Sequence, residues 1–198
     1  MSKEVGAILL DTRSIQKYVF SCNKLKTNVG ASYLVDGIFN DLMQKIVLPS
    51  FNLKMPEISW QKSEQIEMIK DDSIEAEIVY IGGGNMLILI NKFSEKEDNL
   101  NLCREIVKKW TLEILKKAPG LKTGAAIGMM DVERFKDSLD KMYVQLKQNQ
   151  NTVLPQVDLP YTGLTLECNI SGKTADTFDW VDKSWIAKEV KAKTDAYT

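Results

Sequence analysis

The chain begins with apolar runs whose spacing predicts β-strands. Residues 5–10 are continuously apolar and end at Asp11, a pattern typical of a strand that is buried on both faces. Residues 75–81 alternate between apolar and polar side chains, residues 82–85 (Gly-Gly-Gly-Asn) interrupt the alternation, and residues 86–90 are apolar again. Two apolar strands around a glycine turn predict a β-hairpin.

Helical periodicity separates these strands from one another. Apolar residues recur every three or four positions over 34–46, which predicts an amphipathic helix that Pro49 ends. A second helix is expected to begin at the capping-box pattern of residues 94–97, and a third is expected after Asp131. Between these two helices, residues 122–129 are small and apolar and predict a fourth strand.

The order strand, helix, strand, strand, helix, strand is the split βαβ arrangement of ferredoxin-like folds. Right-handed crossovers then place the first strand between the third and the fourth. The sequence therefore predicts an α+β, ferredoxin-like βαββαβ palm over residues 1–150: a four-stranded antiparallel sheet with helices on one face and an irregular insertion at about 49–73. Residues 151–198 are expected to form a turn-rich, helical C-terminal extension, with a lysine-rich helix over 184–198. The helical pattern of this tail is unfinished at residue 198, which fits either a fragment of a longer protein or a small protein that stands alone.

Charge and histidine content exclude several classes of function. The chain has 26 basic and 27 acidic side chains, so it lacks the basic surplus that a protein coating nucleic acid needs. It contains no histidine, which excludes Ser-His-Asp and Cys-His catalysis and every imidazole-ligated metal site. Carboxylates, lysines, hydroxyls, thiols and backbone amides remain as the groups available for chemistry.

The cysteines and the N-terminus indicate a reducing, cytoplasmic location. Cys22, Cys103 and Cys168 are odd in number, lie far apart and include no C-x-x-C pair, so we expect neither a disulfide framework nor a zinc site. The first residues lack the apolar run of a signal peptide, and no apolar stretch approaches the roughly 20 residues that span a membrane.

The predicted topology brings Asp11 and the hairpin tip, residues 82–85, to the same edge of the sheet, and it places Asp131 at the opposite edge. A carboxylate at a strand end beside a glycine hairpin is the layout of a palm-type nucleotidyl-transfer site, which usually works with two magnesium ions. Such ions need several oxygen ligands. Only Asp11 is acidic at this edge, because the amide of Asn85 is neutral. We therefore expect Asp11 to be a metal ligand in a site that has no catalytic residue.

Each candidate residue also has a structural interpretation. Asp11 is a ligand, a cap for a helix beginning near Ser14, or both. Ser14 and Gln16 either contact a nucleotide or satisfy backbone groups at that helix start. The glycines either let a flat base or a phosphate approach the backbone or simply form a tight turn.

Residues 10–20, Leu-Asp-Thr-Arg-Ser-Ile-Gln-Lys-Tyr-Val-Phe, resemble the aspartate-x-x-glycine-isoleucine-glutamine-x-aromatic-isoleucine-phenylalanine signature of the large subunit of type III CRISPR effector complexes. The similarity continues through residues 25–26 and 30–34. Residues 80–85, Tyr-Ile-Gly-Gly-Gly-Asn, resemble the tyrosine-x-glycine-glycine hairpin of that family. The matching segments occur in the family's order over about residues 5–130.

This resemblance implies a function in antiviral defence. The family has two palms related to polymerases and nucleotide cyclases, and it makes cyclic oligoadenylates from ATP when target RNA is bound. Its active palm has a glycine-glycine-aspartate-aspartate hairpin, whereas this chain has no acidic residue there and is similar to the other palm. The resemblance thus implies a degenerate palm that binds ATP, with magnesium, as half of a composite site. The site residues would be Asp11, Thr12, Ser14, Gln16, Gly82, Gly83, Gly84 and Asn85.

A second palm, in the same protein or in a second copy, would complete the site, and CRISPR effector subunits would be partners. The family's nuclease needs a histidine, which this chain lacks. Where the family often has paired zinc-binding cysteines, this chain has Cys168 followed by Ser171. The alternative function is a non-catalytic scaffold for subunit assembly in a defence complex. A cyclase or polymerase active on its own would need an acidic cluster that this edge lacks.

Overall fold

The computed structural model describes residues 3–63, 65–151 and 161–197. Contacts group the chain into two compact units that alternate along the sequence. We call Met1–Arg13, Asp41–Trp110 and Thr123–Val153 the sheet unit, and Ser14–Asn40, Thr111–Lys122 and Leu154–Thr198 the helical unit. The predicted C-terminal extension thus shares a unit with two segments of the predicted palm region. Among the described residues, no helix combines the length and apolar content that a membrane crossing requires.

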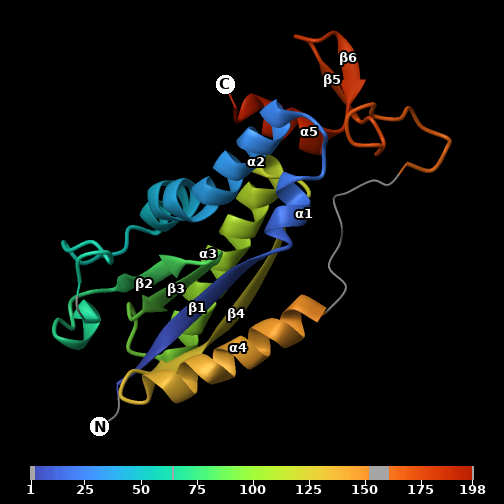
Figure 1. The fold of residues 1–198 in the computed structure, drawn as a ribbon. Helices are drawn as coiled ribbons and strands as arrows, with labels where there is room; N and C mark the ends of the chain where they lie inside the picture. The colour runs from blue at the N-terminus through green and yellow to red at the C-terminus, as the bar shows by residue number, and fades with distance from the viewer. Residues whose placement is uncertain (1–2, 64, 152–160, 198) are drawn as a thin grey trace. The chain divides into compact units, whose positions relative to one another are not determined.

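The sheet unit is built on a four-stranded antiparallel sheet with strand order β2-β3-β1-β4 (Figure 1). Its strands are β1 (Glu4–Arg13), β2 (Ala76–Gly82), β3 (Asn85–Ile90) and β4 (Lys122–Asp131). The predicted positions of the four strands and the central place of the first are confirmed. Residues 5–10 of β1 are all buried, as their continuous apolar character predicted.

Helices cover both faces of this sheet, so the prediction of helices on one face is wrong. Helix α3 (Lys96–Lys117) packs on the face of Gly6, where an added Cβ would lie 3.1 Å from the sulfur of Cys103. Helix α4 (Phe135–Asn151) packs on the opposite face (Figure 1). There Met142 and Leu146 share a core with β1 side chains. The physical reason lies in β1 itself, because a strand that is apolar on both faces needs cover on both.

The insertion predicted at about 49–73 contains no strand among its described residues. It holds two short 3₁₀ helices, η2 (Leu48–Phe51) and η3 (Glu67–Ile69). The buried carboxylate of Glu77, on β2, accepts hydrogen bonds from the backbone N–H groups of Glu67 and Met68, at 2.8 and 2.7 Å. These two hydrogen bonds attach the insertion to β2, an outer strand of the sheet.

The helical unit contains α1 (Ile15–Val19), α2 (Leu25–Gly37), β5 (Thr177–Asp179), β6 (Ser184–Ile186) and α5 (Lys188–Asp195). Helix α2 continues as the π-helical segment η1 (Ile38–Val47), so the helix predicted over 34–46 begins nine residues earlier than expected. The C-terminal helix starts at Lys188 rather than at Ser184, because residues 184–186 pair with β5 in a small hairpin.

Candidate functional site

The structure brings Asp11 and the glycine hairpin together at one edge of the sheet, as the sequence predicted. Asp11 lies opposite Asn85 in the pairing of β1 with β3, and Asn85 lies opposite Gly82 in the pairing of β2 with β3. Asp131 is at the other end, where the N–H of the next residue bonds to the carbonyl of Lys3 at the start of β1. We call the edge formed by Asp11, Thr12 and residues 82–85 the hairpin edge.

Thr12 attaches the hairpin tip to β1. Its backbone N–H and its hydroxyl both donate to the carbonyl of Gly84, at 2.9 and 3.0 Å. The side chain is buried, with 7% of its surface exposed. Thr12 therefore fixes the position of the turn, and its hydroxyl proton is already used for that purpose.

The three glycines of the turn have different roles. Gly83 and Gly84 have φ of +61° and +84°, values that a two-residue hairpin turn requires and that other residues adopt only with strain. Gly82 is in the β2 strand and needs no special backbone conformation. A Cβ at Gly82 or Gly83 would have no other atom within 4 Å. The tip thus presents backbone that faces solvent and is not covered by side chains. The turn itself does not require a glycine at position 82.

Asp11 is half-buried, and its carboxylate is engaged by the end of α4. The side-chain amide of Gln150 donates to Asp11 Oδ2, and the guanidinium of Arg13 donates to the Gln150 carbonyl at 2.7 Å. Burial raises the pKa of Asp11 above its ordinary value, outweighing the Gln150 hydrogen bond and the charge of Arg13, which both act to lower it. Asp11 lies within β1 and Ser14 is the N-cap of α1, so the interpretation of Asp11 as a helix cap is wrong.

A pair of tyrosines connects the hairpin strand with α4. The hydroxyl groups of Tyr80, on β2, and Tyr143, on α4, lie 2.8 Å apart. Burial raises the pKa of Tyr80, and the hydrogen bond with Tyr143 raises it further. The Tyr80 phenol is therefore neutral at physiological pH, and the Tyr80 of the tyrosine-x-glycine-glycine motif packs against the core of the sheet unit.

Ser14 and Gln16 belong to the helical unit rather than to the sheet unit. Both side chains are exposed. Ser14 has φ of +54° and occupies the N-cap position of α1, but its hydroxyl makes no capping hydrogen bond. Their carbonyls accept hydrogen bonds from the N–H groups of Tyr18 and Phe20, each at 2.9 Å. The sequence predicts that Ser14 and Gln16 satisfy backbone groups at the start of the helix. In the structure their backbone carbonyls do this and their side chains do not.

The hairpin edge offers few oxygen ligands for a cation. It therefore suits a cation whose other ligands belong to a bound group. Among the described residues, no three acidic or cysteine side chains converge as a metal site. Asp11 offers a carboxylate and Asn85 a neutral amide oxygen across the β1–β3 pair. Magnesium in nucleotide sites is often held by one or two carboxylates together with phosphate oxygens and water. The edge therefore fits magnesium bound to a nucleotide better than a free ion.

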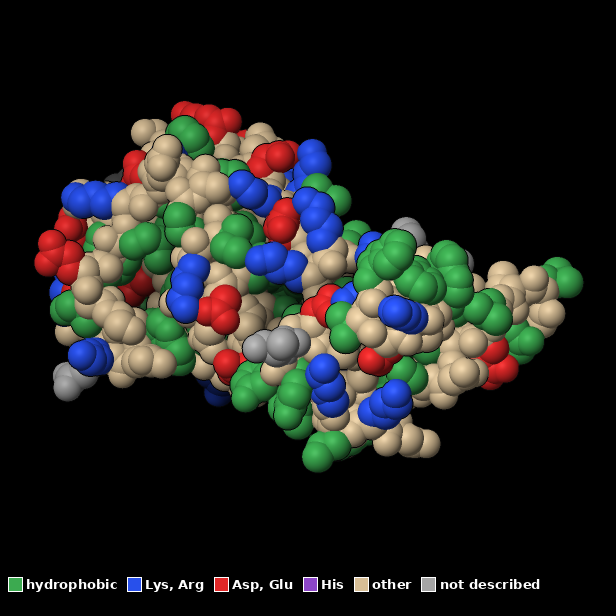
Figure 2. Space-filling view, turned by 90° about the horizontal axis from the view of Figure 1, so that it is seen from above, with side chains coloured by type: hydrophobic (Ala, Val, Ile, Leu, Met, Phe, Trp, Pro, Cys, Tyr) green, Lys and Arg blue, Asp and Glu red, His purple; other side chains and the backbone are tan. Residues whose placement is uncertain are grey.

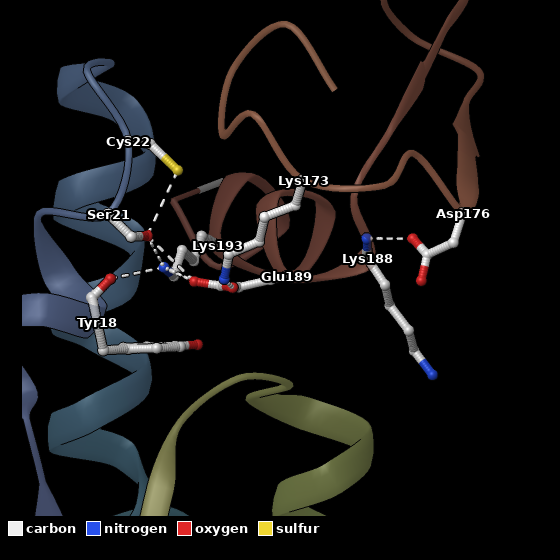
Figure 3. Close-up of polar contacts among 8 residues, drawn as sticks. All are labelled: Tyr18, Ser21, Cys22, Lys173, Asp176, Lys188, Glu189 and Lys193. Atoms are coloured by element: carbon white, nitrogen blue, oxygen red, sulfur yellow. Dashed lines mark hydrogen bonds and ion pairs between the residues drawn. The ribbon is translucent and has the colours of Figure 1, made fainter. Parts of the chain in front are cut away.

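A buried ion cluster in the helical unit was not predicted (Figure 3). Lys193 has no exposed surface, and its ammonium donates to the Tyr18 carbonyl at 2.6 Å, to the Ser21 hydroxyl at 2.7 Å and to the Glu189 carboxylate. Lys173 donates to the other oxygen of Glu189. Burial lowers the pKa of Lys193, while the two lysines hold the pKa of Glu189 below its ordinary value against the effect of burial. The cluster joins α5 to α1 inside the helical unit.

The β5–β6 hairpin exposes aromatic side chains. Trp180, Val181 and Trp185 are 81%, 83% and 53% exposed. The ring of Phe178 lies edge-on to the rings of Trp180 and Trp185, with centroids 4.8 and 5.5 Å apart. Figure 2 looks down on this part of the chain and shows hydrophobic side chains gathered on its surface. Exposed apolar groups of this size commonly mark contact sites for other molecules.

Comparison with known protein families and with curated proteins gives no match for this chain.

Proposed function

We propose that this chain is a degenerate nucleotidyl-cyclase or polymerase-type palm, with a ferredoxin-like core, that belongs to a CRISPR-associated or related antiviral defence protein. It binds ATP or a similar nucleotide with magnesium at the hairpin edge and does not catalyse a reaction alone. A second palm, in the same protein or in a second copy, supplies the missing acidic ligands, and effector subunits are its partners.

The observation that carries this proposal is the pairing of a single carboxylate with a bare glycine turn. Asp11 and Asn85 face each other across β1 and β3, and the turn beside them has open space at Gly82 and Gly83. Open backbone lets a flat base or a phosphate approach closely, and one carboxylate is enough to contact a cation held by phosphates. Two-metal catalysis would need further carboxylates, which the described residues do not bring to this edge.

The Asp11→Asn variant tests this proposal. We expect its affinity for ATP with magnesium, measured by isothermal titration calorimetry, to fall by about tenfold or more, because a charged ligand becomes neutral at nearly constant shape. Asp131→Asn is the matched control, since it makes the same change at the opposite edge, and it should bind as the wild type does. Equal affinity in both variants, or no heat from the wild type, would remove the proposal.

The alternative function, a scaffold for subunit assembly, is favoured by the exposed aromatic side chains of the β5–β6 hairpin. Serine at both Trp180 and Trp185 distinguishes the two functions in co-purification with effector subunits. A scaffold would lose its partners in this double variant and keep them in Asp11→Asn. A nucleotide-binding palm would keep its affinity for ATP in the Trp180 and Trp185 double variant and would lose it in Asp11→Asn, as calorimetry measures.

A further inference from the structure

The turn that joins α1 to α2 exposes two large apolar side chains. Phe20, the C-cap of α1, and Leu25, the first residue of α2, are 69% and 79% exposed. Folding removes most side chains of this kind from water, and a single exposed one is common on any protein surface. Two on one short turn acquire significance from the charged residues around them.

The same turn carries positive charge without compensation. Lys17, Lys24 and Lys26 are all exposed, and no acidic residue occurs between Asp11 and Asp36 in the sequence. Among the described residues, none of these three lysines has a carboxylate within ion-pair distance. The chain as a whole is nearly neutral, so this local surplus of positive charge attracts anionic partners to the turn.

The inner side of the turn is held in place by the rest of the helical unit. The Ser21 hydroxyl donates to the Glu189 carboxylate at 3.1 Å, the Thr27 hydroxyl donates to the Lys24 carbonyl at 2.7 Å, and Cys22 is buried. The charge of Glu189 is already balanced by the two lysines of the buried ion cluster, so it does not offset the lysines outside. Because the backbone is fixed before any partner arrives, little ordering is needed on binding.

We infer that the α1–α2 turn docks on the surface of an anionic lipid membrane, with Phe20 and Leu25 inserted below the headgroups and the three lysines beside the lipid phosphates. A membrane surface places negative charge directly above an apolar phase, and the turn carries the two matching features. A single-stranded nucleic acid would attract the lysines and stack on Phe20, but it offers no apolar phase to Leu25. Docking of this kind lies on the membrane and needs no spanning helix.

Co-sedimentation of the chain with lipid vesicles tests this inference. Vesicles of mixed phosphatidylcholine and phosphatidylserine should bind the wild type about a hundredfold more tightly than phosphatidylcholine alone, because each lysine near an anionic surface contributes roughly fivefold. Phe20→Ser combined with Leu25→Ser should lower binding to the mixed vesicles by about a hundredfold. Leu164→Ser combined with Leu166→Ser is the matched control, since it removes two other exposed leucines from the helical unit, and it should bind as the wild type does.

Salt dependence supplies a second readout for the lysines. Binding of the wild type to mixed vesicles should weaken as salt is raised, and glutamine at all three of Lys17, Lys24 and Lys26 should remove most of this dependence. No binding of the wild type to mixed vesicles, or equal binding by the Phe20 and Leu25 double variant, would overturn the inference. Labelled oligouridine RNA that binds the wild type in a lysine-dependent way while the vesicles do not bind would overturn it in favour of a nucleic acid. None of these results depends on nucleotide binding at the hairpin edge, so the proposed function is tested separately.

Discussion

Gly30→Ala is expected to lower the free energy of unfolding by about 3 kcal/mol, although alanine is normally the better helix residue. Gly30 lies inside α2, where its buried backbone faces α5. A Cβ at this position would lie 1.7 Å from the carbonyl oxygen of Lys193 and 2.9 Å from its carbonyl carbon. These are backbone atoms, so no side-chain rotation relieves the overlap and α5 must move away from α2.

Urea unfolding followed by circular dichroism measures this change. Gly82→Ala is the matched control, because a Cβ there meets no atom within 4 Å and its backbone conformation suits any residue. The control should stay within about 0.5 kcal/mol of the wild type, as surface substitutions usually do. If Gly30→Ala were as stable as the wild type or more stable, the close packing of α2 against α5 would be incorrect.

Lys193→Met should have the second large effect, a loss of about 3 kcal/mol, which is typical when one partner of a buried ion pair is removed. The ammonium of Lys193 is fully buried, lies 3.9 Å from the centre of the Tyr18 ring and donates to three oxygens. Methionine fills much of the space but leaves the Ser21 hydroxyl and the Tyr18 carbonyl without this donor. Glu189 keeps Lys173 as its only remaining lysine partner in the cluster.

The control for this variant is Lys191→Met on the same helix. Lys191 is partly exposed and pairs with Asp179 and Asp195, so its loss should cost about 1 kcal/mol or less. Combining Lys193→Met with Glu189→Leu should cost less than the sum of the two single changes, because the uncompensated charge is removed together with its partner. Additive losses in the double variant would show that the two side chains do not interact.

The sheet was predictable from the sequence because its signals are local. The continuous apolar run of β1 and the alternation before the glycine turn extend over a few neighbouring residues, and they determine strand type and pairing without reference to distant parts. The hairpin edge follows from the same signals, since right-handed crossovers leave few possible topologies. The sequence alone therefore predicts that Asp11 and residues 82–85 lie together.

The remaining features depend on partners far away in the sequence. Gly30 resembles an interruption of a helix, and only the backbone of α5 explains why a glycine is needed inside α2. Gln150 belongs to a polar stretch at the end of α4, and no short-range pattern connects it with Asp11. Lys193 is one of many lysines near the C-terminus, and its burial follows from tertiary contacts with Tyr18 and Ser21.

Nuclear magnetic resonance of the ¹⁵N-labelled chain tests the central claim most directly, because the glycine amides of the hairpin report on the edge itself. Titration with ATP and magnesium should shift the amide signals of Thr12 and of residues 82–85, while chromatography of the same sample finds the ATP unchanged. Signals at the hairpin edge that do not move, or any linear or cyclic oligonucleotide formed by the isolated chain, would contradict the account of a palm that binds nucleotide without converting it.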